Sequence, residues 1–518
     1  MEHKQVGNES LDHMSVHEHW LTRNRALAAT GAFAVYAAAL AIYTGGADQT
    51  WAVWGAVTYG VVTILIWVTR RSRVPLIVPL LVSFAGALAA PLFWLATRVS
   101  PTPEVQVISR SAELLLQHGT PYLAPGQLDN WLSYNPYLPL MAAFGLPRAL
   151  GLTGMLGDPR VWMTLVSVVL IAAAFWFAAP HLACRSCSRN VALSTVFAAS
   201  SPVIAFPLAI GITDPPVIAL LLLTLALAAR PGRRAMWAGV ALGVASAMKS
   251  TAWPAIPIFA AMMATRDGVK AMWRFIGVVI ILAGALSAAM APAALSTPAA
   301  FLQNTVLFPL GLTQHKTPAA SPLPGHLLAM TGSAGHMAAV ALLGLAGLGF
   351  AVSLIVRPPS DARGAAFRIA LGLAVMFTLA PATRWGYFVY PIGLIGWVAL
   401  TGRGTAPTSV SGDDGTSADT ETPADAEIPV GAGTPVGAGS PVSAGSPVSA
   451  GTSVGGAARA PAIASMIGGV SVSSVIAGAS AVAANATRWP GKPGLPPKLA
   501  TAQTKELGAD WNPVCHAK

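Results

Sequence analysis

A glutamate that closely follows an apolar stretch is the residue of this chain best suited to acid–base chemistry. Glu104 comes after the hydrophobic stretch 74–97 and a short proline-rich segment, so we expect it at or just above a membrane surface. A glutamate carboxyl has an ordinary pKa of about 4.3, and partial removal from water raises that value toward one useful for a base. Glu104 could therefore take a proton from a hydroxyl group. A solvated loop carboxylate is the alternative interpretation.

Two more charged residues stand at the borders of hydrophobic stretches. Asp214, followed by two prolines, could cap the helix that begins there, because carboxylates favour the N-terminal end of a helix, or it could share in binding an acceptor. Lys249 interrupts an apolar run. A lysine at membrane depth needs a partner, an aqueous cavity or an anionic ligand.

Further cations could join Lys249 in binding a phosphate. Arg384 stands alone between the last two hydrophobic stretches, and His315 and Lys316 lie in a proline-stiffened segment. Arg110, in the first long polar loop, is a further candidate for contact with the substrate. Arginine and lysine are the side chains that recognise phosphate most often, whereas anchoring at the membrane interface is the alternative for each of them.

The segment 98–160 is too long and too polar to be a simple connection between two hydrophobic stretches. Its residues Tyr122, Tyr134, Asn135 and Tyr137 could line a sugar-binding site, or they could pack within the loop itself. A chain that is mostly apolar but builds one elaborate polar loop is expected to carry its chemistry there.

The composition indicates a membrane protein. Of 518 residues, 54% are hydrophobic and 10% are charged, and the mean hydropathy is +0.61. Apolar runs of about 17–25 residues recur, the length that crosses a hydrocarbon core of about 30 Å. The net charge of +11 would also suit nucleic acid. The basic residues, however, gather in short loops between apolar runs, as the positive-inside rule predicts for cytoplasmic connections.

The sequence therefore predicts an all-α, polytopic membrane protein with about twelve spans. We expect these spans at 26–43, 51–69, 74–97, 161–180, 191–210, 214–229, 235–248, 252–265, 273–295, 336–356, 367–382 and 385–401. The pair at 235–265 is short, and it is either a hairpin with Lys249 at its tip or one broken helix; the charge pattern favours the hairpin. We also expect a helix lying along the interface over 136–150.

This assignment orients the chain in a plasma membrane. Both termini are expected in the cytoplasm, with Glu104, Lys249 and Arg384 on the extracytoplasmic face. The expected organisation is a cytoplasmic tail at 1–25, two additional N-terminal helices at 26–73, a transmembrane unit at 74–401 with outer loops 98–160 and 296–335, and a tail at 402–518. The tail is rich in Gly, Ser, Thr, Pro and Ala, a composition typical of disorder.

The order of these features resembles the C-type (GT-C) membrane glycosyltransferases, and in particular glycosyltransferase family 87, the polyprenyl-phosphate-mannose-dependent α-mannosyltransferases. The resemblance covers about residues 74–400. It is carried by an acid just after an early span, by the runs 111–122 and 134–140, by the turn 211–214 and by the glycine-spaced run 239–245.

The resemblance implies roles for the residues above. In such enzymes the acid of the first loop is the catalytic base, a place that falls on Glu104 here, although the family more often has aspartate there. Gln106 stands where a second acid would be needed, so we expect no metal site and no cofactor. The implied donor is a polyprenyl-phosphate sugar whose phosphate Lys249 and Arg384 would hold. A hydroxyl of a glycan or glycolipid acceptor would attack the sugar with inversion, with Glu104 as the catalytic base and Asp214 as the second candidate catalytic residue.

Two other classes of protein remain as alternatives. A transporter or lipid flippase would place polar groups near the middle of the bilayer and show internal repeats, and neither is evident in the sequence. A membrane scaffold that has lost catalytic activity is the other alternative.

Overall fold

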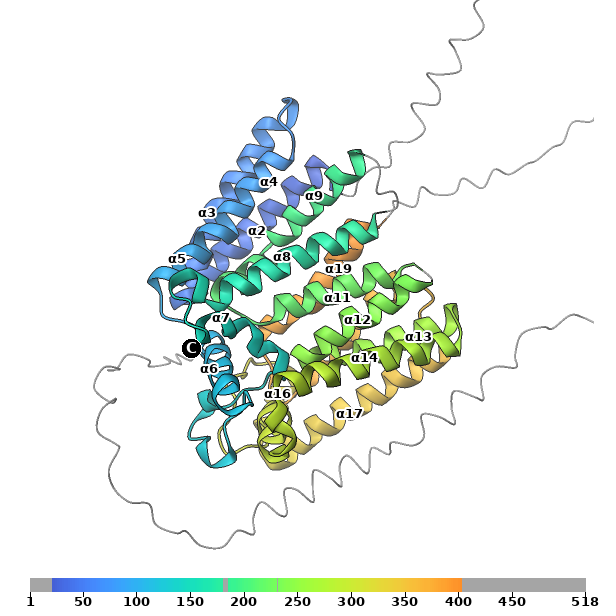
Figure 1. Ribbon diagram of the computed structural model, residues 1–518. Helices are drawn as coiled ribbons and strands as arrows, with labels where there is room; N and C mark the ends of the chain where they lie inside the picture. The colour runs from blue at the N-terminus through green and yellow to red at the C-terminus, as the bar shows by residue number, and fades with distance from the viewer. Residues whose placement is uncertain (1–20, 180–184, 231, 403–518) are drawn as a thin grey trace, which may run out of the picture. The chain divides into compact units, whose positions relative to one another are not determined.

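A computed structural model describes residues 21–179, 185–230 and 232–402. The described part is built from helices, and its sole β-type pairing is an isolated bridge between Ala320 and Thr383 (Figure 1). The low-complexity tail expected at 402–518 and most of the N-terminal tail fall outside the described residues.

The helices follow one another with short connections, except in two regions. The first half contains α2 (Arg23–Tyr43), α3 (Gly46–Val68), α4 (Ile77–Phe84) with the π-helical turn η2 (Ala85–Ala89) and α5 (Ala90–Arg98), α6 (Pro103–His118), α7 (Leu146–Ala149), α8 (Pro159–Ala178), α9 (Arg185–Ala199) and α10 (Pro202–Ile210). The second half contains α11 (Asp214–Ala228), α12 (Arg233–Met248), α13 (Ala255–Arg266), α14 (Val269–Met290), α15 (Pro298–Leu302), α16 (Pro324–Ala329), α17 (Ser333–Val356), α18 (Ala362–Leu379) and α19 (Val389–Thr401). The two longer connections are those around α6 and α7 and around α15 and α16.

The helices confirm a multi-pass membrane protein. Within the described residues seven helical segments are long and apolar enough to span a membrane, or eight if the bent pair α9 and α10 forms one span. Other helices at predicted spans, such as α11 and α12, are apolar but shorter. The expected number of twelve spans is therefore not confirmed.

The predicted hairpin around Lys249 is present. Arg266, at the end of α13, donates from Nη1 to the carbonyl oxygen of Ala228, the last residue of α11, at 2.5 Å. Because α12 follows α11 directly, α12 begins where α13 ends. The two helices therefore run in opposite directions, and Lys249 lies in the turn that joins them.

The segment predicted as a helix along the interface over 136–150 is helical from Pro139 to Ala149, but most of it is 3-10 helix rather than α-helix. The chain forms the 3-10 helix η5 (Pro139–Gly145) and the single turn α7. Prolines are tolerated at the start of a helix but not inside it, and Pro139 and Pro147 each stand in the first turn of one of these short elements. At Gly145 an added Cβ would lie 2.5 Å from the carbonyl oxygen of Ile108, so α6 and η5 pack backbone to backbone.

The two additional N-terminal helices are packed onto the rest of the chain through buried aromatic residues of α3. Trp51 donates from Nε1 to the carbonyl oxygen of Ala87 at 2.8 Å, and Tyr59 donates to that of Ser200 at 2.6 Å. Buried Trp and Tyr side chains usually find such partners, and here they join α3 to η2 and to the α9–α10 bend.

Helix α11 lies at the centre of the helical packing. Almost all of its side chains are buried, on every face, and it packs against both α8 and α12. A helix that is hydrophobic all round belongs in such a place. Its N-terminal end is thereby held in a fixed position, at Thr213 and Asp214.

Candidate functional site

An ion pair joins the start of α6 to the segment between α18 and α19. The side chain of Glu104, in the first turn of α6, accepts a hydrogen bond at Oε1 from Nη1 of Arg384, 3.0 Å away. Arg384 lies directly before the 3-10 helix η10 (Trp385–Phe388). The Arg384 side chain is 36% exposed and that of Glu104 is 18% exposed, so solvent or a ligand can reach this pair.

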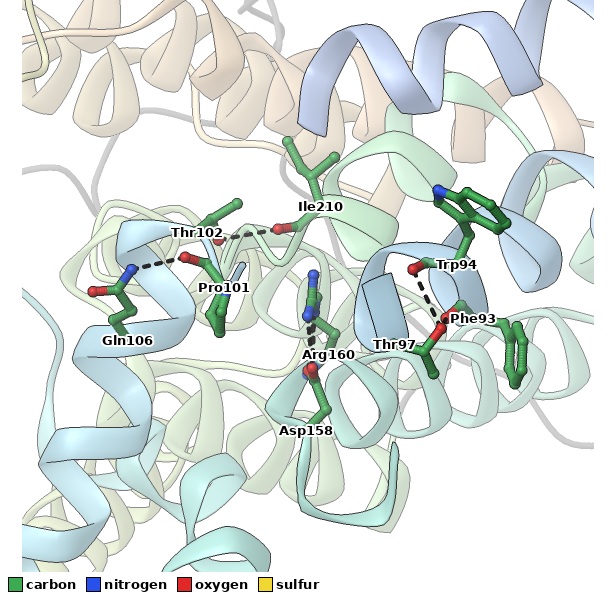
Figure 2. A network of polar contacts seen from close by, with 9 residues as sticks. All are labelled: Phe93, Trp94, Thr97, Pro101, Thr102, Gln106, Asp158, Arg160 and Ile210. Atoms are coloured by element: carbon green, nitrogen blue, oxygen red, sulfur yellow. Dashed lines mark hydrogen bonds and ion pairs between the residues drawn. The ribbon is translucent and has the colours of Figure 1, made fainter. Parts of the chain in front are cut away.

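Local contacts set the position of α6 and hence of Glu104. Thr102, which precedes the helix, donates from Oγ1 to the carbonyl oxygen of Ile210 at 3.0 Å, and Gln106 donates from Nε2 to that of Pro101 at 2.8 Å (Figure 2). The first contact ties the start of α6 to the end of α10. Glu104 is therefore held beside the turn that leads into α11.

Thr213 receives the other oxygen of the Glu104 carboxylate. Its backbone N–H donates to Oε2 of Glu104 at 3.2 Å, and its hydroxyl lies 3.5 Å from the same oxygen. The Thr213 hydroxyl also accepts from Nζ of Lys249 at 3.2 Å. Thr213 thus stands between the Glu104 carboxylate and the Lys249 amine.

A second ion pair lies deeper than the first. Nζ of Lys249 is 2.5 Å from Oδ1 of Asp214, and their side chains are 11% and 2% exposed. Burial lowers the pKa of Lys249, but the Asp214 carboxylate and other anionic neighbours outweigh burial, so the net pKa is raised and the amine stays charged. The amine also lies over the rings of Tyr137 and Tyr387, at 5.5 and 5.6 Å from their centroids, within the range of a cation–π contact.

A glycine makes this arrangement possible. Gly211 has a φ of +94°, and an added Cβ would lie 2.3 Å from Cγ2 of Val105 and 2.9 Å from Cγ of Arg160. The Arg160 guanidinium is itself held by Asp158, at 2.7 Å between Nη2 and Oδ2 (Figure 2). The close approach of α6 and α8 to the turn before Thr213 therefore requires glycine at this position.

The charged residues open into a pocket of about 290 Å³. The polar part of the lining includes Glu104, Lys249 and Arg384. The lining is also rich in apolar residues, among them Leu343 of α17 and Phe377 of α18. A ligand with an anionic group and a long apolar part could place both in one site.

The structure brings together Glu104, Asp214, Lys249, Arg384 and Tyr137, five of the residues selected from the sequence. All but Asp214 line the pocket, and Asp214 contacts it through Lys249. Burial raises the pKa of Tyr137 well above its ordinary value, so its hydroxyl stays neutral.

Other residues selected from the sequence hold the long loop together. Asn135 donates from Nδ2 to the hydroxyl of Ser111 at 2.9 Å, and its backbone N–H donates to Oδ1 of Asn304 at 2.7 Å. The Tyr122 hydroxyl donates to the carbonyl oxygen of Tyr137 at 2.9 Å. These bonds fix the backbone beside the pocket, and neither Asn135 nor Tyr122 lines it.

The remaining selected residues lie at the margin of the pocket. Tyr134 lines it and stacks on Phe308, with ring centroids 4.3 Å apart, and the ring of His315 meets Tyr134 edge-on at 6.4 Å. Lys316 is exposed and lies outside the lining. Arg110 donates to the carbonyl oxygen of Ser133 at 3.2 Å and also lies outside the lining.

Sequence reasoning assigned no role to four residues at or beside the site. In the sequence, Thr213 is only part of the turn before a helix. Its place next to Asp214 is the one signal for its contacts with Glu104 and Lys249. Tyr387 follows Arg384 by three positions, so the two share one face of a helical turn, which is a weak signal. The hydroxyls of Thr251 and Tyr390 lie 2.8 Å apart, and no sequence pattern predicts this contact.

The donor set does not suggest a metal ion. Within the part of the chain that the structure describes, no group of three or more His, Cys, Asp or Glu side chains could hold one. Each carboxylate of the site is instead paired with a cation. The arrangement suits proton transfer at Glu104 and charge stabilisation at Lys249 and Arg384.

The model of glycosyltransferase family 87 matches residues 134–381, and this match confirms the family to which the sequence resemblance assigns the chain. The match supports a membrane glycosyltransferase. No curated protein matches it. Glu104 precedes the matched segment and Arg384 follows it, so the exposed ion pair joins residues from its two flanks.

Proposed function

We propose that this chain transfers a hexose, mannose in the first instance, from a polyprenyl-phosphate sugar to a hydroxyl of a glycan or glycolipid, with inversion and in the manner of GT-C enzymes. The observation that carries the proposal is the pocket in which a carboxylate, two cations and an apolar wall meet. The carboxylate can receive the proton of the acceptor hydroxyl, the cations can bind the donor phosphate, and the apolar wall can contact the start of the lipid chain.

The two ion pairs differ in how readily they can exchange a partner. The Lys249–Asp214 pair is nearly buried, whereas the Glu104–Arg384 pair is partly exposed. A donor phosphate therefore replaces Glu104 on Arg384 more easily than it replaces Asp214 on Lys249. Arginine suits this exchange because its planar group can donate two hydrogen bonds to a phosphate.

Release from Arg384 leaves the Glu104 carboxylate free to act as the base. The acceptor oxygen forms a bond to the anomeric carbon while its proton passes to Glu104, and the bond between that carbon and the phosphate oxygen breaks. The products are the new glycoside and a polyprenyl phosphate that carries the additional negative charge. Arg384 and the charged Lys249 stabilise this charge as it develops.

Lys249, held in place by Asp214, serves as a fixed positive charge. Asp214 keeps Lys249 charged and in place, and Thr213 connects the amine to the base. Groups that are held in position before the reaction lower its barrier because they need not reorganise during it. We place this face on the extracytoplasmic side of the plasma membrane, with both chain ends in the cytoplasm, as the distribution of basic residues favours.

The test measures transfer of radiolabelled mannose from synthetic polyprenyl-phosphate mannose by the full chain in permeabilised membrane vesicles. The matched pair of variants is Glu104→Gln and Glu113→Gln, because both residues lie on α6 and Glu113 is exposed. We expect Glu104→Gln to lower transfer at least about a hundredfold, as loss of a general base does. Glu113→Gln should leave it unchanged.

The other outcomes have definite meanings. Equal transfer by wild type and Glu104→Gln would keep the class of enzyme and move the base to Asp214. If wild-type protein transfers no mannose, glucose and arabinose donors on the same lipid carrier are tested next. Failure with every sugar donor, in protein that is folded, contradicts the proposal and favours a transporter or an inactive scaffold.

A further inference from the structure

A second cavity lies apart from the candidate site and is the larger of the two. It encloses about 710 Å³ and is bordered by α8, α11, α12 and η5. Its lining is entirely apolar and includes Leu170 and Phe177 of α8, Leu223 and Leu227 of α11, and Trp237 and Val244 of α12. Nothing in the proposed reaction uses this cavity.

The cavity is a groove whose length matches one leaflet of a bilayer. Helix α11 packs between α8 and α12, and those three helices run side by side (Figure 1). The α12 part of the lining extends from Trp237 to Met248, about 16 Å at 1.5 Å per residue. Half of a hydrocarbon core is about 15 Å thick. The groove therefore fits an acyl chain of one leaflet.

The groove is closed off from the candidate site. The backbone N–H of Leu138 donates to the carbonyl oxygen of Met248 at 3.0 Å, and the buried Tyr137 lies beside this bond. A donor lipid with its phosphate at Arg384 would have to cross that wall to reach the groove. The apolar lining also has no group that could hold a phosphate. The occupant is therefore a lipid other than the sugar donor.

A basic residue, Arg230, lies at the end of the groove opposite the candidate site. Arg230 donates from Nη2 to the carbonyl oxygen of Ala179 at 2.7 Å, so it lies where α8 and α11 both end. Helix α12 begins at Arg233. Trp237, which lines this end, is 63% exposed, as expected for a residue anchored at a membrane interface. A basic residue beside such an opening attracts an anionic lipid head group.

We propose that the groove binds an acyl chain of an anionic phospholipid from the leaflet opposite the candidate site, with its phosphate at Arg230. The chain would fill the space beneath η5, whose residues Leu140 and Phe144 close the far end of the groove. This lipid supports the loop next to Tyr137 and does not take part in the transfer.

The test uses phospholipids that carry a photoactivatable diazirine in the acyl chain, in vesicles that contain the full-length protein. One probe is phosphatidylglycerol, which is anionic, and the other is phosphatidylcholine, which is zwitterionic. After illumination, the labelled peptides are identified by mass spectrometry. We expect phosphatidylglycerol to label α8 and α12 at the groove about fivefold more than phosphatidylcholine does.

Two variants test the chain and the head group separately. Val244→Trp fills the groove, and Ile281→Trp, on the exposed face of α14, is its matched control. Arg230→Gln removes the cation, and Arg363→Gln removes one at the start of α18, a helix that contributes no residue to the lining of the groove. Labelling should fall about fivefold or more in Val244→Trp and Arg230→Gln and remain unchanged in both controls.

Each other result overturns the proposal. Equal labelling by the two phospholipids, or labelling that is insensitive to Arg230→Gln in folded protein, rejects an anionic head group. Labelling of the groove by a diazirine polyprenyl phosphate in place of phosphatidylglycerol assigns it to the sugar donor. A crosslink between two copies of the chain assigns it to a protein interface. None of these readouts depends on sugar transfer, so the result is independent of the proposed function.

Discussion

The Glu104 carboxylate lies 3.0 Å from the Arg384 guanidinium, although 280 positions separate the two residues in the chain. The proposed base is therefore paired with Arg384, the residue proposed to bind the donor phosphate. When an anionic donor binds to Arg384, the same step releases the Glu104 carboxylate.

Replacement of Arg384 by glutamine should weaken donor binding and lower the rate of transfer. Removal of one charged hydrogen-bond partner of a ligand typically costs about 2–5 kcal/mol, so we expect kcat/KM for the donor to fall by about thirtyfold or more. Arg384→Lys should recover only part of this loss, because lysine cannot donate in a bidentate way. Steady-state kinetics with a synthetic donor measure both effects. An unchanged KM for the donor in Arg384→Gln would remove Arg384 from the phosphate site.

Thr213 should act as a positioning residue for Glu104. Thr213→Val preserves the shape of the side chain but removes the hydroxyl that lies between Glu104 and Lys249. We expect kcat to fall about tenfold with little change in KM for the donor, since the loss of one hydrogen bond is worth about 1–1.5 kcal/mol.

The control for that prediction is Thr213→Ser, which retains the hydroxyl and should restore most of the activity. The pH dependence of kcat gives a readout that a purely structural role would not move. Its acidic limb, set by the base, should shift in Thr213→Val and return in Thr213→Ser. Equal activity of the two variants would show that the hydroxyl has no part in the reaction.

The Lys249–Asp214 pair should contribute to folding as well as to the reaction. Lys249→Met leaves a buried carboxylate without its cation, which is expected to lower the free energy of unfolding by about 3–5 kcal/mol. The double variant Lys249→Met and Asp214→Leu removes both charges and should regain much of that stability. Thermal unfolding in detergent measures the recovery. Transfer activity should remain low in both variants, because the positive charge is missing.

Gly211→Ala should destabilise the turn that holds Thr213 and Asp214. The positive φ alone costs about 1–3 kcal/mol for a residue with a Cβ, and the contact with Val105 adds to that cost. Thermal unfolding should show a clear decrease in Tm. Gly126→Ala is the matched control, because no atom lies within 4 Å of its added Cβ and its φ is negative. A Tm equal to wild type in Gly211→Ala would mean that the turn can relax without loss.

The predictions made from local sequence patterns differ in their outcome for physical reasons. Helices at the apolar runs and the hairpin around Lys249 are present because hydropathy and charge are properties of short segments. The segment expected as one helix over 136–150 is helical, but it is divided into a 3-10 helix and a single α-turn, each with a proline in its first turn. The roles of Glu104 and Lys249 in catalysis remain predictions, since their positions alone do not test them.

The sequence by itself determined that this chain is a helical membrane protein with one long polar loop, and it indicated the family. Such properties depend on composition and on the order of residues along the chain. Only the tertiary structure decided that Glu104 is paired with Arg384, that Thr213 stands between Glu104 and Lys249, and that a separate apolar groove lies beside α11. Those relationships arise from the packing of helices that are distant in sequence, and no spacing within one segment specifies them.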